Sequence, residues 1–123
     1  MRRYPAGLPI QTINFGGGTP SLLSPAQLTA ILGACRSHFA ADYGAEVSIE
    51  ANPGGLRREY FEGIRRAGVT RLSFGVQSFH SAELAMLTRR HNATEARAAV
   101  QAAREAGFDN LNLDFMYGLP AQT

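Results

Sequence analysis

The sequence predicts an α/β protein, a partial parallel (β/α) barrel of about four strand-helix units. Short segments in which apolar and polar residues alternate are each followed by a longer segment whose apolar residues recur at helical spacing. Strands joined by helices of this length pair in parallel through crossovers, since a tight hairpin cannot join them. Each strand also keeps one polar or small-residue face, whereas a strand between two helix layers is apolar on both faces.

The first strand is expected at about residues 10–15, with Ile13 and Phe15 on its apolar side. It runs into the turn Gly16-Gly17-Gly18-Thr19-Pro20. Three successive residues without a Cβ allow a sharp turn and let a ligand approach bare amide and carbonyl groups. The turn lacks the glycine spacing of a dinucleotide fold and the lysine of a P-loop, so it indicates a binding site without naming the ligand.

A helix is predicted to follow, because Ser24, Pro25 and Gln27 have the chemistry of an N-cap, a first helical residue and a capping box. Its buried face is expected to comprise Leu28, Ile31, Leu32, Cys35 and Phe39. Cys35 is therefore interpreted as a core residue in preference to a reactive thiol.

The second unit begins with a strand at about 46–50, broken by Asn52-Pro53-Gly54-Gly55. Its helix, at about 56–67, is expected to bury Tyr60, Phe61 and Ile64 and to end at Gly68. The unit repeats the order of strand, turn and helix seen in the first. It therefore predicts a second parallel strand with its own covering helix.

The third strand is expected at about 71–77, followed by a short helix capped by Ser81 and a longer helix near 94–106 that ends at Gly107. The buried face of the longer helix would carry Ala96, Ala99, Val100 and Ala103. A fourth strand at about 110–115 sets Leu111, Leu113 and Phe115 on its apolar side. Residues 117–120 leave it as a turn.

The polar face of these strands predicts a ligand site. It carries Thr12, Asn14, Gly16, Ser48, Glu50, Ser73, Gly75, Gln77, Asn112 and Asp114. Gly16, Glu50, Gln77 and Asp114 come last in their strands, at the carboxyl edge where parallel α/β sheets bind ligands. Taken singly, Glu50 could instead cap the next helix or pair with an arginine, and Asp114 could cap the turn after it.

Composition limits the function classes. The sequence has no run of about 18 apolar residues and no charged-then-apolar leader, so neither a membrane span nor a secretory signal is expected. The single cysteine suits the reducing cytoplasm. A net charge of +2 without a basic run interleaved with aromatics argues against nucleic acid. His38, His80 and His91 share no metal-ligand spacing, which predicts core or surface roles for them.

Several segments resemble, in order, the motifs of the radical S-adenosylmethionine (SAM) family. They are residues 15–23 around the glycine turn, Glu50-Ala51-Asn52-Pro53-Gly54, residues 71–79, Arg89-Arg90-His91 and residues 112–120. The match is to the branch that contains oxygen-independent coproporphyrinogen III oxidase. Within it, the Glu-Ala-Asn-Pro-Gly and Arg-Arg-His segments look closer to the radical SAM haem chaperone.

The resemblance implies a SAM site on the inner face of a partial barrel of the radical SAM type. Its positions are Gly17, Gly18, Thr19, Glu50, Gln77, Arg89 and Asp114. In the family the glycine turn lies against the methionyl part of SAM. For Arg89 the alternative is a solvated arginine at a helix end, and Arg90 is expected at the surface.

The family's [4Fe-4S] cluster needs three thiolates from a Cys-x-x-x-Cys-x-x-Cys loop upstream of the glycine turn, whereas this chain has only Cys35, downstream of it. We therefore expect residues 1–123 to be an internal fragment of the radical SAM core, spanning its second to fifth strands. The cluster loop and a C-terminal domain would be absent, and the fragment would be inactive alone. Porphyrinogen or haem would be a ligand of the parent protein only.

Three hypotheses stay open on the sequence. The parent is either an oxidase, which uses a 5′-deoxyadenosyl radical to abstract hydrogen from propionate side chains, or a chaperone that binds and delivers haem. An unrelated α/β barrel enzyme whose glycine turn binds a phosphate or a sugar is the alternative outside this family.

Overall fold

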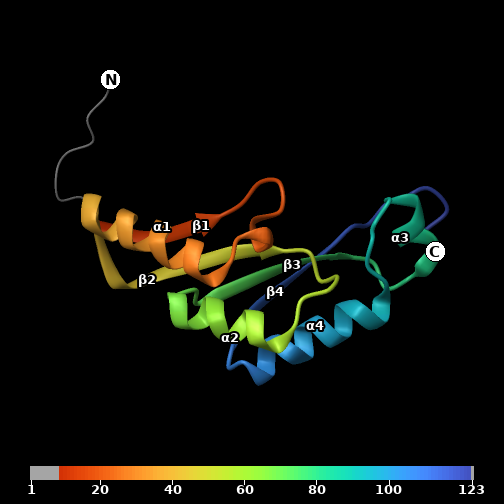
Figure 1. Cartoon of the computed structure of the whole chain (residues 1–123). Coiled ribbons are helices and arrows are strands. Elements are labelled where there is room, and N and C mark those ends of the chain that lie inside the picture. The colour runs from red at the N-terminus through yellow and green to blue at the C-terminus, as the bar shows by residue number, and fades with distance from the viewer. Residues whose placement is uncertain (1–8, 123) are drawn as a thin grey trace.

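A single parallel sheet organises the chain. The computed structural model describes residues 9–122, with the backbone alone at 40–43. The strands are β1 (Pro9–Phe15), β2 (Ala40–Ala51), β3 (Arg71–Gln77) and β4 (Asn110–Phe115). They lie in the order β1-β2-β3-β4, and every neighbouring pair is parallel (Figure 1). The predicted α/β class and parallel pairing are confirmed.

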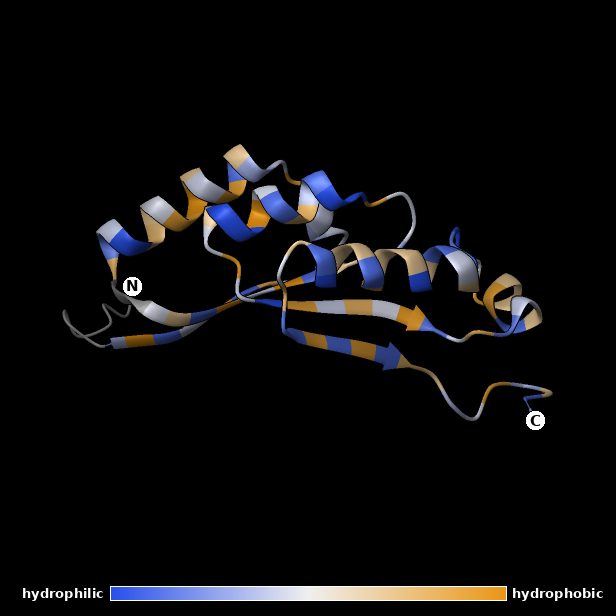
Figure 2. Ribbon diagram, turned by 90° about the horizontal axis from the view of Figure 1, so that it is seen from below, coloured by the Kyte–Doolittle hydropathy of each residue, from blue (hydrophilic) through white to orange (hydrophobic). Residues whose placement is uncertain are grey.

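The helices cover one face of this sheet. They are α1 (Pro25–His38), α2 (Arg58–Ala67), α3 (Ser81–Met86) and α4 (Ala93–Glu105), with a short 3₁₀ helix η1 (Pro20–Leu22) after the glycine turn. Figure 2 shows α1, α2 and α4 on the same side, with the other face of the sheet bare. Strands added in one direction with their crossovers on one side form a (β/α) barrel wall, whereas a doubly wound sheet has helices on both faces. The predicted partial barrel is thereby confirmed.

The hydrophobic core lies between the helices and the apolar face of the sheet. At its centre Phe61 of α2 meets Phe74 of β3 edge to face, with ring centroids 5.8 Å apart, and both side chains are fully buried. Tyr60 is half-buried beside them, and burial raises the pKa of its hydroxyl, which donates to the Leu23 carbonyl oxygen at 3.2 Å. The expected buried residues of β2, α2 and β3 are confirmed. They include Val47, Ile49, Ile64, Leu72 and Val76.

Three residues predicted to be buried are exposed instead. Phe39 is 52% exposed because α1 ends at His38 and the backbone of Phe39 is extended, which takes its side chain out of helical phase. Ile31 is 39% exposed, on the flank of a stripe that is fully buried at Leu28 and Leu32. Phe115 is 51% exposed at the end of the edge strand β4, so the prediction was wrong for all three.

Helix ends follow local chemistry with one exception. The predicted capping box at Ser24 is present, and in it the backbone amide of Gln27 donates to Ser24 Oγ at 3.2 Å. Gly68 ends α2 in the left-handed conformation at φ 111°. Ser81 does not cap α3, because the N-cap is His80 and Ser81 is already helical.

None of the helices within residues 9–122 is long and apolar enough to cross a bilayer.

Replacing Gly63 by alanine is expected to lower the free energy of unfolding by about 1–2 kcal/mol, although alanine is the better helix former. Gly63 is buried in α2, and a Cβ there would lie 2.6 Å from Pro25 Cγ at the start of α1. The proline ring is stiff, so α1 itself would have to move. Urea denaturation of the variant measures the change.

The matched control is Gly33→Ala in α1, where an added Cβ meets no atom within 4 Å. Gly33 is exposed, so this variant is expected to be more stable by about 0.5–1 kcal/mol through helix propensity alone. Equal denaturation midpoints for the two variants would show that the contact between α1 and α2 is loose.

Candidate functional site

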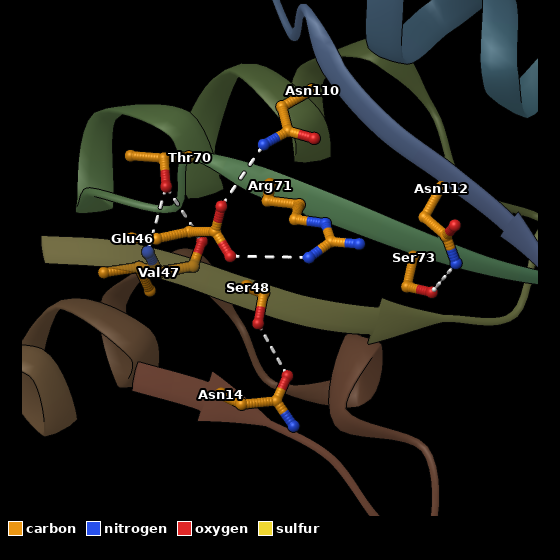
Figure 3. Close-up of polar contacts among 9 residues, drawn as sticks. All are labelled: Asn14, Glu46, Val47, Ser48, Thr70, Arg71, Ser73, Asn110 and Asn112. Carbon is orange, nitrogen blue, oxygen red and sulfur yellow. Dashed lines mark hydrogen bonds and ion pairs between the residues drawn. The ribbon is translucent and has the colours of Figure 1, made fainter. Parts of the chain in front are cut away.

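The bare face of the sheet is joined across its strands by side-chain hydrogen bonds. Ser48 Oγ on β2 donates to Asn14 Oδ1 on β1 at 2.6 Å (Figure 3). Ser73 Oγ on β3 accepts from Asn112 Nδ2 on β4 at 3.0 Å and donates to Asp114 Oδ2 at 2.9 Å. Asn112 Nδ2 also donates to Asp114 Oδ1 at 2.7 Å. The polar residues that the sequence predicts on one face of the strands therefore form one continuous polar surface.

Charges at the amino-terminal half of this surface pair with one another. Glu46 on β2 accepts from Arg71 Nη1 at 3.4 Å and from Asn110 Nδ2 at 3.3 Å (Figure 3). Thr70 Oγ1 accepts from the Val47 backbone amide nearby, at 2.9 Å. The Glu46 carboxylate is thus paired within the sheet, whereas the carboxylates at the opposite, carboxyl edge, Glu50 and Asp114, line a pocket.

The glycine turn lies against Glu50. The Gly17 backbone amide donates to Glu50 Oε2 at 3.4 Å. A Cβ at Gly16 would lie 3.0 Å from Glu50 Oε1 and 3.1 Å from Asn14 Nδ2, so a side chain there would have to displace the ends of these two side chains. Gly17 and Gly18 both have positive φ, at 81° and 54°. A positive φ favours glycine at both positions, because residues with a Cβ rarely adopt it.

Gln77 occupies a strained turn at the end of β3. Its φ is 68°, and the Ser78 amide donates to the Val76 carbonyl at 2.8 Å across it, which makes a γ-turn. The register between β3 and β4 also shifts between Phe74 and Gln77. A non-glycine residue at positive φ is unfavourable and persists where its surroundings enforce it, commonly at a functional site.

These features surround one pocket of about 210 Å³ at the carboxyl edge of the sheet. Its lining comprises Gly18, Thr19, Pro20, Glu50, Ala51, Asn52, Ser73, Gly75, Gln77, Arg89 and Asp114. Six of the seven residues expected from the sequence lie in that lining. They come from β2, β3 and β4, from the glycine turn after β1 and from the loop between α3 and α4. Gly17, the seventh, reaches it through its hydrogen bond to Glu50.

Part of this lining was not predicted from the sequence. Ser73 and Gly75 lie on the polar face of β3, and for that reason they could have been included among the expected site residues. A Cβ at Gly75 would lie 3.0 Å from Gln77 Nε2, so this glycine makes room for the glutamine amide. Asn52 lies in the loop after β2, where strand alternation no longer applies, and its place in the segment Glu50-Ala51-Asn52-Pro53-Gly54 was the signal that could have included it.

The pocket combines charges of both signs. Two carboxylates, Glu50 and Asp114, come from β2 and β4, and the Arg89 guanidinium comes from the loop between α3 and α4. Within residues 9–122, no salt bridge joins Arg89 to either carboxylate. Such a set can bind a polar ligand that carries both a cationic and an anionic group. No group of three potential metal ligands occurs in the same range.

The comparison with protein families decides the family. A model described as the radical SAM superfamily matches residues 1–123. The chain belongs to the radical SAM superfamily. Its relatives include the haem chaperone HemW of Haemophilus influenzae, 42% identical over 114 residues, which covers 93% of this chain and 30% of the relative. HemW of Escherichia coli is 42% identical over 120 residues, covering 98% of this chain and 32% of the relative.

The same branch supplies a solved structure. The radical SAM enzyme coproporphyrinogen III oxidase (HemN) of Escherichia coli matches with a TM-score of 0.85 and 36% identity, over 96% of this chain and 27% of that one. The radical SAM fold and the placement in the HemW and HemN branch, expected from the motifs, are confirmed. The chain spans about 30% of the length of the curated relatives it matches.

The superfamily implies two cofactors, SAM and a [4Fe-4S] cluster, and this chain's residues suit them unequally. The cluster does not fit, because it needs three thiolates and Cys35, the chain's sole cysteine, lies on α1, away from the residues that line the pocket. SAM fits the donor and acceptor set of the pocket, since it carries an ammonium group, a carboxylate, a sulfonium and ribose hydroxyls. Residues 1–123 cannot supply the three thiolates that such a cluster needs.

Proposed function

We propose that this chain forms the SAM-binding wall of a radical SAM protein in the HemN and HemW branch. The observation that carries the proposal is the convergence of Gly18, Thr19, Glu50, Gln77, Arg89 and Asp114 on one pocket at the carboxyl edge of the sheet. These residues are separated by up to 96 positions in the sequence, counted from 18 to 114. Their convergence supports one ligand shared by all four units.

The chemistry of each group suggests its role. Carbonyl oxygens of the Gly17-Gly18 turn can accept hydrogens from the ammonium group, because no side chain intervenes. Glu50 and Asp114 can accept from the ammonium or from ribose hydroxyls, and Gln77 can bond a hydroxyl or the carboxylate. Arg89 can hold the carboxylate through its planar fork of donors. When bound with its cluster, SAM supplies radical chemistry in this superfamily.

We further propose that residues 1–123 correspond to the second to fifth strands of the barrel. The cluster loop would then belong to a segment that these residues do not include, and the chain would be inactive alone. The reducing cytoplasm is the compartment we propose, because a sole cysteine can form no internal disulfide.

The identities within the branch favour the chaperone type for the parent protein. Two HemW relatives are 42% identical to this chain, against 36% for the coproporphyrinogen III oxidase of Escherichia coli. Haem titration of the complete parent protein separates the two. Stoichiometric haem binding without porphyrinogen turnover is expected, and turnover without haem binding would select the oxidase.

Nuclear magnetic resonance titration of the ¹⁵N-labelled 123-residue chain with SAM tests the pocket itself. We expect backbone amide shifts concentrated at Gly18, Thr19 and Gln77, with no shifts on α1 or α2. Inorganic phosphate and a simple methyl glycoside serve as competing probes. Strong shifts at the glycine turn with phosphate or the glycoside, and none with SAM, would select the alternative of an anion-binding or sugar-binding barrel.

A further inference from the structure

His91 lies behind the pocket and contacts two of its walls. It follows Arg89 by two residues and immediately precedes Asn92, the N-cap of α4. Its side chain is 2% exposed. One ring nitrogen, Nδ1, lies 3.0 Å from Asn52 Oδ1 in the loop after β2, and the other, Nε2, lies 3.0 Å from the Val76 carbonyl oxygen at the end of β3. Both partners are oxygens, so the ring donates to both of them, and bridges the ends of two neighbouring strands, when each of its nitrogens carries a hydrogen.

The hydrogen bonds at Asn52 determine which end of its amide is engaged. Asn52 Oδ1 accepts from the Gly54 backbone amide at 3.3 Å, in addition to its contact with His91 Nδ1. Both groups face the same oxygen, so the amide nitrogen of Asn52 keeps its two hydrogens for other partners. Within residues 9–122 no hydrogen bond from that nitrogen is found, although Asn52 lines the pocket.

The second contact reaches the strained turn of Gln77. The Val76 carbonyl oxygen accepts both from the Ser78 amide, which closes the γ-turn around Gln77, and from His91 Nε2. A carbonyl oxygen has two lone pairs, so both donors can be accommodated. His91 thus fixes the carbonyl on which the positive φ of Gln77 depends.

We propose that His91, with a hydrogen on each ring nitrogen, is a positioning residue of the SAM pocket. It turns the Asn52 amide so that its NH₂ group serves an oxygen of the bound ligand, and it holds the Gln77 turn in place. Asn52 and Arg89 then supply donors from adjacent segments for the ligand's carboxylate or hydroxyl oxygens. This inference rests on the proposed SAM site, but its structural half concerns Asn52 and Gln77 without any ligand.

Three variants separate positioning from general stability. His91→Phe keeps a ring and removes both donors, His91→Gln keeps one amide donor, and Asn52→Ala removes the positioned group. Loss of one hydrogen bond to a charged ligand group weakens binding about tenfold. We expect SAM affinity to fall about tenfold in His91→Phe and in Asn52→Ala, and by less in His91→Gln. The double variant should bind no more weakly than His91→Phe, because both changes remove the same contact.

His38→Phe is the matched control, since His38 is exposed on α1 and its hydrogen bonds to described residues, Ser37 and Ala34, stay within that helix. It should bind SAM as the unmodified chain does. The ligand-free readout is the Asn52 side-chain amide and the Ser78 backbone amide in ¹⁵N spectra, which should shift in His91→Phe and His91→Gln and not in His38→Phe. His91→Gln keeps the test open if His91→Phe does not fold.

The outcomes distinguish this inference from the proposed function. Folded His91 variants with unchanged SAM affinity, or with unchanged Asn52 and Ser78 signals, would overturn the positioning role. Additive losses in the double variant would overturn the route through Asn52. If the unmodified chain fails to bind SAM, the proposed function falls, and the ligand-free signals then decide alone whether His91 positions these two groups.

Discussion

Replacing Phe61 by alanine is expected to lower the free energy of unfolding by about 3–5 kcal/mol. The ring is fully buried in α2 and meets both Tyr60 and Phe74 edge to face, at centroid distances of 5.9 Å and 5.8 Å. Its removal loses the transfer free energy of a large apolar side chain and leaves a cavity between α2 and β3. Urea denaturation followed by circular dichroism measures the change.

Phe39→Ala is the matched control for this substitution. It removes the same side chain from a position that is 52% exposed, just after α1. The expected loss is about 1 kcal/mol or less, because much less apolar area leaves water there on folding. A loss at position 39 as large as that at position 61 would place the core elsewhere than between the helices and the sheet.

Glu50→Gln is expected to weaken SAM binding about 10- to 100-fold with little effect on stability. The substitution keeps the size of the side chain and its oxygen for the Gly17 amide, and it removes the negative charge from the pocket. A cationic or hydroxyl-bearing ligand loses a charge-assisted hydrogen bond. Titration with SAM, followed by amide shifts at Gly18 and Thr19, measures the affinity.

Glu46→Gln controls for charge on the same strand. Glu46 lies four residues earlier on the same face of β2, about 13 Å from Glu50 along the strand, and pairs with Arg71. Its removal is expected to leave SAM affinity unchanged and to cost at most about 1 kcal/mol of stability, as for an exposed ion pair. Equal affinity losses in the two variants would mean that overall charge governs binding and that the pocket does not.

Parallel pairing and the polar face of the sheet follow from the order of residues alone. The third and fourth strands were predicted at their observed bounds, 71–77 and 110–115, because period-two alternation between Gly68 and Gln77, and again after Gly107, is a local signal. The second strand was predicted six residues too short at its start, because residues 40–45 do not alternate. There, β1 and β2 pair with a shift in register between Ile10 and Thr12.

The burial of particular side chains was less predictable. Helical periodicity assigned Ile31 and Phe39 to a buried face, but it contains no information on how wide the neighbouring element is or where the helix ends. Phe115 alternates correctly on β4 and is nevertheless exposed, since β4 is the edge of the sheet. These outcomes depend on what packs opposite each residue, which only the assembled layers define.

The sequence by itself determined the family, the parallel order of strands and the set of residues at their carboxyl ends, because motif spacing and strand parity are local properties of the chain. Only the tertiary structure decided that the Glu50 carboxylate meets the Gly17 amide, that Gln77 lies in a γ-turn at positive φ, and that Asn52 joins the pocket. Each of these depends on contacts between segments from different units. His91 connects two of them, and its partners lie 39 and 15 residues away in the chain, beyond the reach of any local pattern.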